Sequence, residues 1–357
     1  GNYFWDREKQ QMYDKFNISG GIDRRMESEL SEWNPVDPIW LLNQRNGGRS
    51  TVINWPAGDY ERSENAGVKM KRNRQPFGDH SNWPGELKMV VDALKTDNQV
   101  LWYLPEPDST LHGHGFNDGK LELVLTDLDK LFGSLIKRMG EKGFLNDTDI
   151  ILTADHGHIQ IIPGKTLCVN RIFGDEFTSD PSYHAGDSNI YHSDPSKVQE
   201  MYEKLRSHVE KDKLPYRVYL QKEVPATWHY VNRDRMGDIV IEPLPGGQVK
   251  MNCQADPKDE HSSTHGQDPN LKEMHALLVM SGPSFHASKK ISEIPENIDI
   301  FPLMARLLNI REPSNDGHVH RLKSALRSVD KGNNPDSSET WQFVMGIFLT
   351  LAFTMIM

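Results

Sequence analysis

The stretch Gln99-Val-Leu-Trp-Tyr-Leu-Pro-Glu-Pro-Asp-Ser-Thr-Leu-His112 passes from an apolar run into a polar segment. Its first six residues predict a buried β-strand, and the prolines that follow favour a loop. Asp108 and His112 lie in that loop. Because carboxylate oxygen and imidazole nitrogen are zinc ligands, the stretch predicts a strand whose carboxyl end carries a pair of metal ligands.

A second apolar run, Asp149-Ile-Ile-Leu-Thr-Ala154, leads directly into Asp155-His156-Gly157. It also predicts a buried strand, and Gly157 permits a tight turn that presents the two side chains before it. In open α/β sheets, ligands bind outside the carboxyl ends of the strands. We therefore expect Asp155 and His156 to converge with the ligands that follow the first strand.

The segment between these strands predicts a helix over residues 121–139, which would complete a βαβ unit. Its apolar residues recur at helical spacing on one stripe: Leu121, Leu125, Leu128, Leu131, Phe132, Leu135 and Met139. Further patterns predict helices over 86–95, 196–211 and 297–308, and strands over 216–220, 238–242 and 276–280. At 357 residues, the chain is long enough for one large α/β domain.

A third candidate ligand, His265, lies in the polar stretch Thr264-His-Gly-Gln-Asp268. Taken alone, it is read by default as a solvated loop histidine.

The three motifs together resemble, in order and spacing, the metal motifs of the ectonucleotide pyrophosphatase/phosphodiesterases, a family of the alkaline phosphatase superfamily. The motifs are Pro105-Glu-Pro-Asp-Ser-Thr-Leu-His112, Thr153-Ala-Asp-His-Gly157 and Thr264-His-Gly-Gln-Asp268. The resemblance covers residues 1 to about 325 and looks closest to the short members, types 4 and 5. It implies an alkaline-phosphatase-like central sheet flanked by helices, with an inserted subdomain between His156 and His265.

The resemblance also implies a set of site residues around two Zn²⁺ ions. Asp108, His112 and His265 would hold one zinc, and Asp155 and His156 the other. In the family the second zinc also takes an early aspartate and a threonine nucleophile. We expect both to precede Gly1, so that this chain alone would be inactive.

Two further residues are candidates for substrate contacts. Asn2, in the opening Gly1-Asn2, would correspond to the family's amide that holds a phosphate oxygen. Tyr103, next to the end of the first predicted strand, would flank the pocket, although packing in the core is the commoner fate of a tyrosine there.

The function implied by the resemblance is zinc-dependent hydrolysis of phosphodiester or pyrophosphate bonds in extracellular nucleotides, releasing nucleoside monophosphates through a covalent Thr or Ser intermediate. The metal ligands leave alternatives open, because they bind the phosphoryl group and not what is attached to it. These alternatives are a lysophospholipid or choline-phosphate diesterase, a phosphomonoesterase, and a catalytically weak cell-surface binding ectodomain.

Charge and cysteine content constrain the partners and the compartment. The net charge of −10 argues against a nucleic-acid scaffold, which would rely on many Lys and Arg contacts to phosphate. Cys168 and Cys253 are compatible with a disulfide and equally with buried thiols. Asn17 and Asn146 each begin a glycosylation sequon.

The carboxyl end predicts membrane attachment. We expect a catalytic domain over 1–328, a polar linker over 329–340, and over 341–357 a hydrophobic helix that is either a membrane anchor or a cleaved lipid-anchor signal. A core helix is the alternative. The resulting expectation is a monomeric protein on the extracellular face of the plasma membrane.

Overall fold

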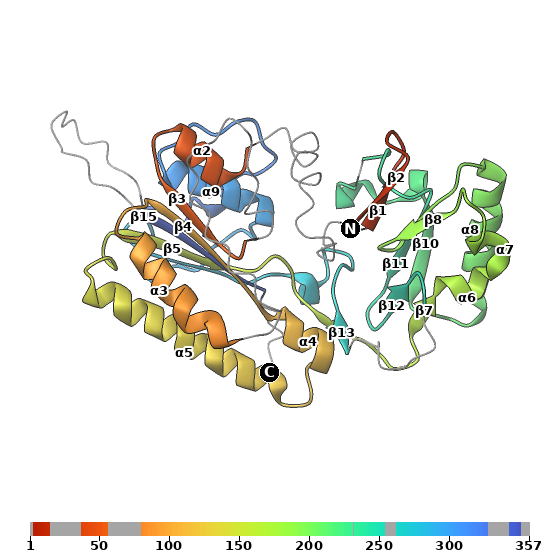
Figure 1. The fold of residues 1–357 in the computed structure, drawn as a ribbon, viewed down its shortest axis with the longest axis horizontal. Helices are drawn as coiled ribbons and strands as arrows, with labels where there is room; N and C mark the ends of the chain where they lie inside the picture. Colours follow the sequence, from red (N-terminus) through yellow and green to blue (C-terminus); the bar gives the residue numbers. More distant parts are fainter. Residues whose placement is uncertain are drawn as a thin grey trace.

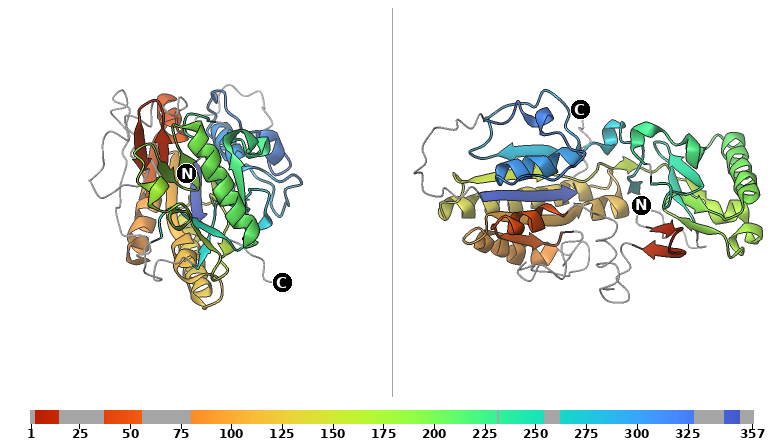
Figure 2. Two further views of the ribbon diagram at one scale, coloured as in Figure 1. Left: turned by 90° about the vertical axis from the view of Figure 1, so that its right-hand side faces the viewer. Right: turned by 90° about the horizontal axis from the view of Figure 1, so that it is seen from above.

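The structure is a computed structural model that describes residues 3–14, 37–55, 80–230, 232–253, 262–327 and 343–350. Asn2, Asn17 and the expected linker over 329–340 lie outside the described residues. The described part forms two lobes, a larger one around a central sheet and a smaller one beside it (Figures 1 and 2). Asn146 is exposed and lies between a helix that ends at Glu141 and a strand that begins at Thr148.

The central sheet of the larger lobe contains the strands predicted near 99–104, 149–154 and 276–280, and two further strands that were not predicted. Its order is β14 (Leu278–Ser281), β5 (Thr148–Thr153), β15 (Phe343–Thr350), β4 (Gln99–Pro107) and β3 (Ser50–Ile53). The pairs β3–β4, β4–β15 and β15–β5 are parallel, whereas β14 runs antiparallel to β5. The carboxyl ends of β4 and β5 therefore lie at the same edge of the sheet, as the βαβ prediction requires.

Helices cover both faces of this sheet (Figure 1). One face packs against α3 (Trp83–Ala93) and α5 (Lys120–Glu141), and the other against α2 (Ile39–Arg45) and α9 (Ile300–Leu307). Neighbouring residues of β4 alternate between the two cores: Trp102 belongs to the first and Leu101 to the second. Burial on both faces explains why β4 reads as a nearly continuous apolar run.

The predicted helix over 121–139 is α5, and its apolar stripe faces the sheet. Leu121, Leu128, Leu135 and Met139 are buried, and the other predicted members of the stripe pack against the same core. The helix predicted over 297–308 is divided between a 3-10 turn at Asn297–Asp299 and α9. Other 3-10 turns lie at His80–Asn82, Gln221–Glu223, Ala226–Trp228, Lys272–Met274 and Val319–Leu322.

The prediction of a hydrophobic helix at the carboxyl end is wrong for residues 343–350. These residues form β15, whose backbone pairs in parallel with β4 on one side and β5 on the other. A short apolar run bounded by polar sequence suits a buried parallel strand as well as a helix, and periodicity alone does not separate them. Pairing with two neighbouring strands satisfies the β15 backbone and gives it the central position in the sheet (Figure 2). Within the described ranges, no helix combines the length and apolar character needed to cross a membrane.

The smaller lobe corresponds to the predicted inserted subdomain. Its own core is built from apolar side chains of helices and strands between residues 167 and 241. A four-stranded antiparallel sheet has the order β10-β11-β9-β8, and β7 pairs in parallel with β12. The elements are β7 (Thr166–Cys168), α6 (Val169–Phe173), α7 (Asp175–Thr178), β8 (His184–Gly186), β9 (Asn189–Tyr191), α8 (Pro195–Lys211), β10 (Tyr216–Leu220), β11 (Ile239–Pro243) and β12 (Gln248–Lys250).

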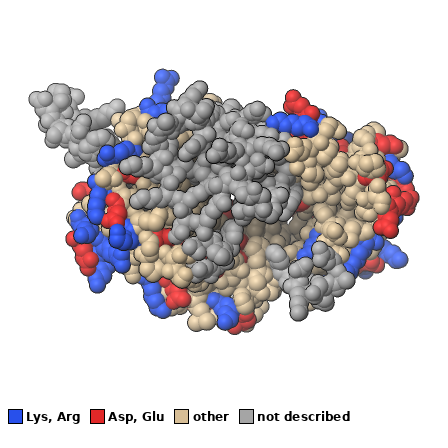
Figure 3. All heavy atoms as spheres, in the orientation of Figure 1, with Lys and Arg blue, Asp and Glu red and all other residues tan. Residues whose placement is uncertain are grey.

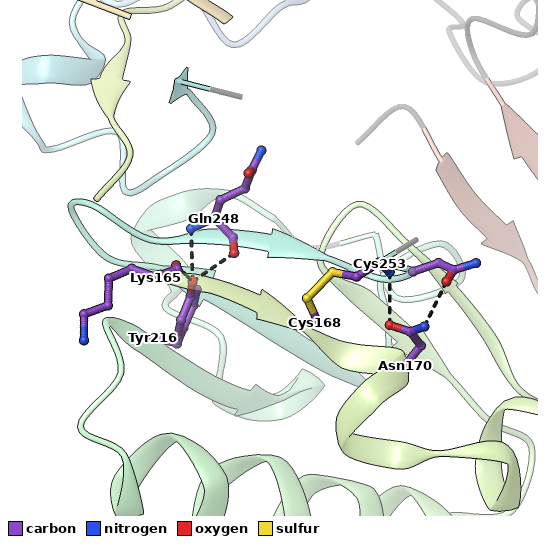
Figure 4. Close-up of a disulfide and its surroundings, with 7 residues drawn as sticks. Lys165, Cys168, Asn170, Tyr216, Gln248 and Cys253 are labelled. Atoms are coloured by element: carbon purple, nitrogen blue, oxygen red, sulfur yellow. Dashed lines mark hydrogen bonds between the residues drawn. A yellow bond between two sulfur atoms is a disulfide. The ribbon is translucent and has the colours of Figure 1, made fainter. Parts of the chain in front are cut away.

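A disulfide between Cys168 and Cys253 closes the β7–β12 side of this lobe (Figure 4). The two Cα atoms are 5.6 Å apart, and 85 positions separate the cysteines in sequence. Beside the bridge, the Asn170 side chain accepts a hydrogen bond from the Cys253 amide (3.1 Å) and donates one to Asn252 Oδ1 (2.9 Å). Of the two states that the sequence left open, the structure has the disulfide.

The hairpin of β1 (Tyr3–Asp6) and β2 (Gln11–Asp14) attaches to the smaller lobe. Trp5 stacks on the ring of His184 with centroids 3.5 Å apart, and Arg7 forms a 2.8 Å ion pair with Asp238. On the described part of the face in Figure 3, acidic and basic side chains are interspersed along both ends of the molecule.

Candidate metal centre

The first ligand pair lies on a helix rather than in the predicted loop. Strand β4 passes directly into α4 (Asp108–His114), where Asp108 and His112 are one turn apart and face the same side. Asp108 Oδ1 and His112 Nε2 are 3.4 Å apart. The buried carboxylate of Glu106 accepts a hydrogen bond from the Thr110 amide (3.0 Å), which stabilises the first turn.

A short antiparallel ladder brings two more histidines to this helix. Strand β6 (Ile159–Gln160) pairs with β13 (Ser263–Thr264), so that Ile159 lies opposite Thr264. Continuing this register by one residue places His158 opposite His265. Neither position depends on a flexible loop, because each histidine directly adjoins a paired strand.

Asp108, His112, His158 and His265 form a compact group, which we call the Asp108 cluster. One potential ligand atom from each lies within 4.8 Å of the others. From Asp108 Oδ1, the Nε2 atoms of His158 and His265 are at 2.6 Å and 3.7 Å. His158 was missed by the sequence reasoning, which considered only the Asp-His pair before Gly157. A signal was present, because His158 completes an Asp-His-Gly-His run.

Hydrogen bonds at Nδ1 orient the imidazoles of His112 and His158. His112 Nδ1–H donates to the Ser263 carbonyl (3.1 Å), and His158 Nδ1–H donates to Ser263 Oγ (3.0 Å). We assign these protons from the partners: a carbonyl only accepts, and the Ser263 hydroxyl donates its own proton to the Leu111 carbonyl (2.7 Å). Both rings thus present Nε2 to the cluster, in the way that metal-binding histidines are commonly held.

Burial and close contacts shift the pKa values of three members of the cluster, His158, His265 and Asp108. Burial lowers the pKa of His158 and lowers the pKa of His265 to about 3, in the second case helped by the nearby His156 ring. Burial alone would raise the pKa of Asp108, but the hydrogen bond with His158 and the other imidazoles outweigh it and lower this pKa. Neutral imidazoles around a carboxylate are the protonation states that bind a divalent metal.

Asp155 and His156 lie beside the cluster in a more open position, and we call them the Asp155 pair. The side chain of Asp155 is 46% exposed, and its Oδ2 is 3.7 Å from His156 Nε2. The His156 ring stacks on His265 with centroids 3.6 Å apart. His156 Nδ1–H donates to the Gly157 carbonyl (3.0 Å), so Nε2 again faces a carboxylate.

Gly157 is required here for a different reason from the one predicted. Its amide donates to the Met274 carbonyl (2.9 Å), and a Cβ atom at this position would overlap the Glu273 carbonyl. The constraint is therefore a close approach of two backbone segments. The Asp155 carbonyl accepts a hydrogen bond from the Asn297 side chain (2.6 Å), which ties the pair to the start of the 3-10 turn before α9.

The donor set and its spacing suit zinc. Tetrahedral Zn²⁺ with ligand distances of about 2.0–2.1 Å separates neighbouring ligand atoms by about 3.3 Å. The 3.4 Å and 3.7 Å separations from Asp108 to His112 and His265 are close to this value. The structure thus brings all five sequence-predicted metal ligands into one region. Tyr103, by contrast, is half-buried and packs edge-on against Trp55.

Comparison with known proteins identifies the family. The model of the type I phosphodiesterase / nucleotide pyrophosphatase family matches residues 1–268. The chain belongs to this family. The matched part of this type I phosphodiesterase / nucleotide pyrophosphatase includes every residue of the Asp108 cluster and of the Asp155 pair.

Relatives of this phosphodiesterase-family chain include bis(5'-adenosyl)-triphosphatase enpp4 of Xenopus laevis, 26% identical over 84% of the chain and 64% of the relative. Ectonucleotide pyrophosphatase/phosphodiesterase family member 5 of Homo sapiens is 25% identical over 88% of the chain and 63% of the relative. The chain thus spans less than two thirds of the length of these relatives. The solved structure of murine ectonucleotide pyrophosphatase/phosphodiesterase 5 has the same fold, with a TM-score of 0.78 and 23% identity over 92% of this chain and 83% of that one.

Proposed function

We propose that the chain binds two zinc ions and takes part in hydrolysing phosphodiester or pyrophosphate bonds of extracellular nucleotides, with release of a nucleoside monophosphate. One zinc is held at the Asp108 cluster and the other at the Asp155 pair. The observation that carries the proposal is the convergence of these ligands at the carboxyl ends of β4 and β5, in a chain of this family. The nucleophile of the proposed reaction is a Thr or Ser, as in the family that the sequence motifs resemble.

In this mechanism, bound zinc would polarise the phosphoryl oxygens and stabilise attacking and leaving groups in line. The residues of this chain would hold the zinc ions and orient the imidazole rings that bind them. The Ser263 carbonyl and hydroxyl fix the rings of His112 and His158, and the Gly157 carbonyl fixes that of His156. The partly exposed carboxylate of Asp155 lies where an anionic substrate would approach from solvent.

The substrate class and the location are parts of the same proposal. Nucleotides joined through phosphoanhydride bonds are favoured because several curated relatives are named bis(5'-adenosyl)-triphosphatases. An extracellular location is supported by the Cys168–Cys253 disulfide, since such bonds persist mainly in oxidising compartments. Exposed Asn146 is available for glycosylation there. We propose a monomer that acts alone.

The test is to load the natural protein that carries this chain with zinc and compare three substrates: a diadenosine triphosphate, a choline-phosphate ester and a simple phosphate monoester. Preferential cleavage of the dinucleotide is expected. Preferential cleavage of the choline-phosphate ester would instead indicate a choline-phosphate diesterase, and preferential cleavage of the monoester a phosphomonoesterase. If zinc supports hydrolysis of none of the three substrates, the enzymatic function is refuted.

Site variants provide the second arm of this test. His265→Ala and Asp155→Ala should each remove most of the zinc-dependent turnover, because each deletes a metal ligand. His114→Ala is the matched control, since His114 is exposed on the same helix as His112 and pairs with Asp118 instead. Wild-type turnover in both ligand variants would remove these residues from the centre.

A further inference from the structure

His158 is the most deeply buried side chain of the Asp108 cluster. Its side chain is 0% exposed, whereas that of His265 is 33% exposed. Its ring centroid lies 4.7 Å from that of His112 and 5.0 Å from that of His265. A wholly buried imidazole among ligand side chains needs a partner for each of its nitrogens.

Both ring nitrogens of His158 have a close partner, Ser263 Oγ at 3.0 Å from Nδ1 and Asp108 Oδ1 at 2.6 Å from Nε2. The Ser263 hydroxyl donates to the Leu111 carbonyl and therefore accepts from His158 Nδ1. Nε2 thus points at the same Asp108 oxygen that His112 and His265 face. A proton shared between Nε2 and this oxygen can be replaced by a metal ion that both atoms bind. Three imidazoles and one carboxylate, with one ligand atom from each within 4.8 Å of the others, are a donor set of the kind that zinc takes.

We propose that His158 is the fourth protein ligand of the zinc held by Asp108, His112 and His265. The inference rests on the proposed function only in assuming that zinc binds there. The separation of His158 Nε2 from Asp108 Oδ1 would widen from 2.6 Å toward the separations already seen for His112 and His265.

A fourth protein ligand would change the role of this zinc. Sites with four protein ligands are closed, whereas catalytic sites keep a position open for water or substrate. The zinc of the Asp108 cluster would then be a closed ion that shapes the field of the site. The phosphoryl group would bind at the ion of the Asp155 pair, whose carboxylate reaches solvent.

The experiment uses Co²⁺ in place of zinc and reads its visible absorption, which is intense for tetrahedral sites and weak for higher coordination. The protein carries Asp155→Asn to weaken the second site while keeping the His156 ring that stacks on His265. With His158 present, we expect an intense spectrum that inorganic phosphate leaves unchanged. With His158→Ala, the site gains an open position, and we expect phosphate to change the spectrum.

Zinc affinity, measured by competition with a chelator, gives a second readout. His158→Ala should weaken zinc binding by at least about 100-fold. Removing a residue that only hydrogen-bonds to a metal ligand already weakens binding by about 10- to 100-fold, and the loss of a ligand should cost no less. His114→Ala is again the control, and thermal unfolding of the metal-free variants shows whether His158→Ala still folds. If the His158→Ala protein does not fold, the same measurements are made on His158→Asn, which retains a polar side chain.

Two results would overturn the proposal: a phosphate-sensitive spectrum while His158 is present, or equal zinc affinity in the His158 and His114 variants. Zinc binding with the expected spectra but without cleavage of any nucleotide would sink the proposed function and leave the assignment of His158 intact.

Discussion

The Asp108 cluster and the Asp155 pair lie side by side but are held in different ways. In the cluster, hydrogen bonds to buried Ser263 orient two rings, and the β6–β13 ladder places two histidines opposite each other. In the pair, half of the Asp155 side chain reaches solvent, and support comes from the backbone around Gly157. The hydrogen bonds thus constrain the side chains of the Asp108 cluster more tightly than those of the Asp155 pair, which is the part more open to solvent.

The largest expected difference between the two parts is in zinc retention. Asp108→Ala removes the carboxylate that three imidazoles face, so zinc affinity at the cluster should fall by at least about 100-fold. Asp155→Ala should remove the more weakly held ion and leave the cluster loaded. Metal content after dialysis against a chelator measures both, with Asp118→Ala on the neighbouring exposed segment as control. Loss of both ions in both variants would show that the two parts do not act separately.

The next effect is on the stability of the backbone that joins the two parts. Gly157→Ala would force apart the backbone segments at Gly157 and Glu273, which should cost about 1–3 kcal/mol in the free energy of unfolding. Gly133→Ala is the control, since open space surrounds that position on α5 and alanine favours a helix. Denaturant unfolding measures both variants. A Gly157→Ala protein as stable as wild type would contradict the close approach.

These regions also show how far the sequence could predict the structure. β4, β5 and α5 were predictable because their apolar periodicity is local. The Asp-His-Gly-His run marks His158 as a candidate ligand, but its contact with Asp108 was not predictable. That contact depends on pairing between β6 and β13, whose residues are about a hundred positions apart. The same holds for β15, whose apolar run is ambiguous until its partners β4 and β5 are known. Long-range pairing, rather than residue type, separates what could be predicted from what could not.

A smaller effect is expected from the residue that orients the cluster. Ser263→Ala removes the hydroxyl that accepts from His158 but keeps the carbonyl that accepts from His112. Zinc affinity at the cluster should fall by about 10-fold, a positioning effect, with no effect on the Asp155 pair. Ser262→Ala is the matched control, because the Ser262 hydroxyl bonds the Gly113 carbonyl at an exposed position. An unchanged affinity would mean that the ladder alone positions His158.

The smallest effect concerns acid stability of the metal-free protein. Burial lowers the pKa of His265 from its ordinary value of 6.5 to about 3, so between these values the unfolded chain binds a proton that the folded chain does not. The contribution of His265 to the free energy of unfolding is therefore fully present above pH 6.5. It should decrease as the pH falls from 6.5 toward 3. The lowered pKa of Asp108 acts in the same direction below pH 3.8.

His265→Gln tests this expectation, because glutamine keeps a polar group but does not titrate. Between pH 6.5 and 4, the variant should lose less stability than wild type, as measured by denaturant unfolding in the presence of a chelator. The effect should be modest, since a third of the His265 side chain is exposed and solvent screens its charge. Equal slopes in the two proteins would mean that His265 accepts a proton in the folded state as readily as in the unfolded one, and that the cluster is more open than its burial indicates.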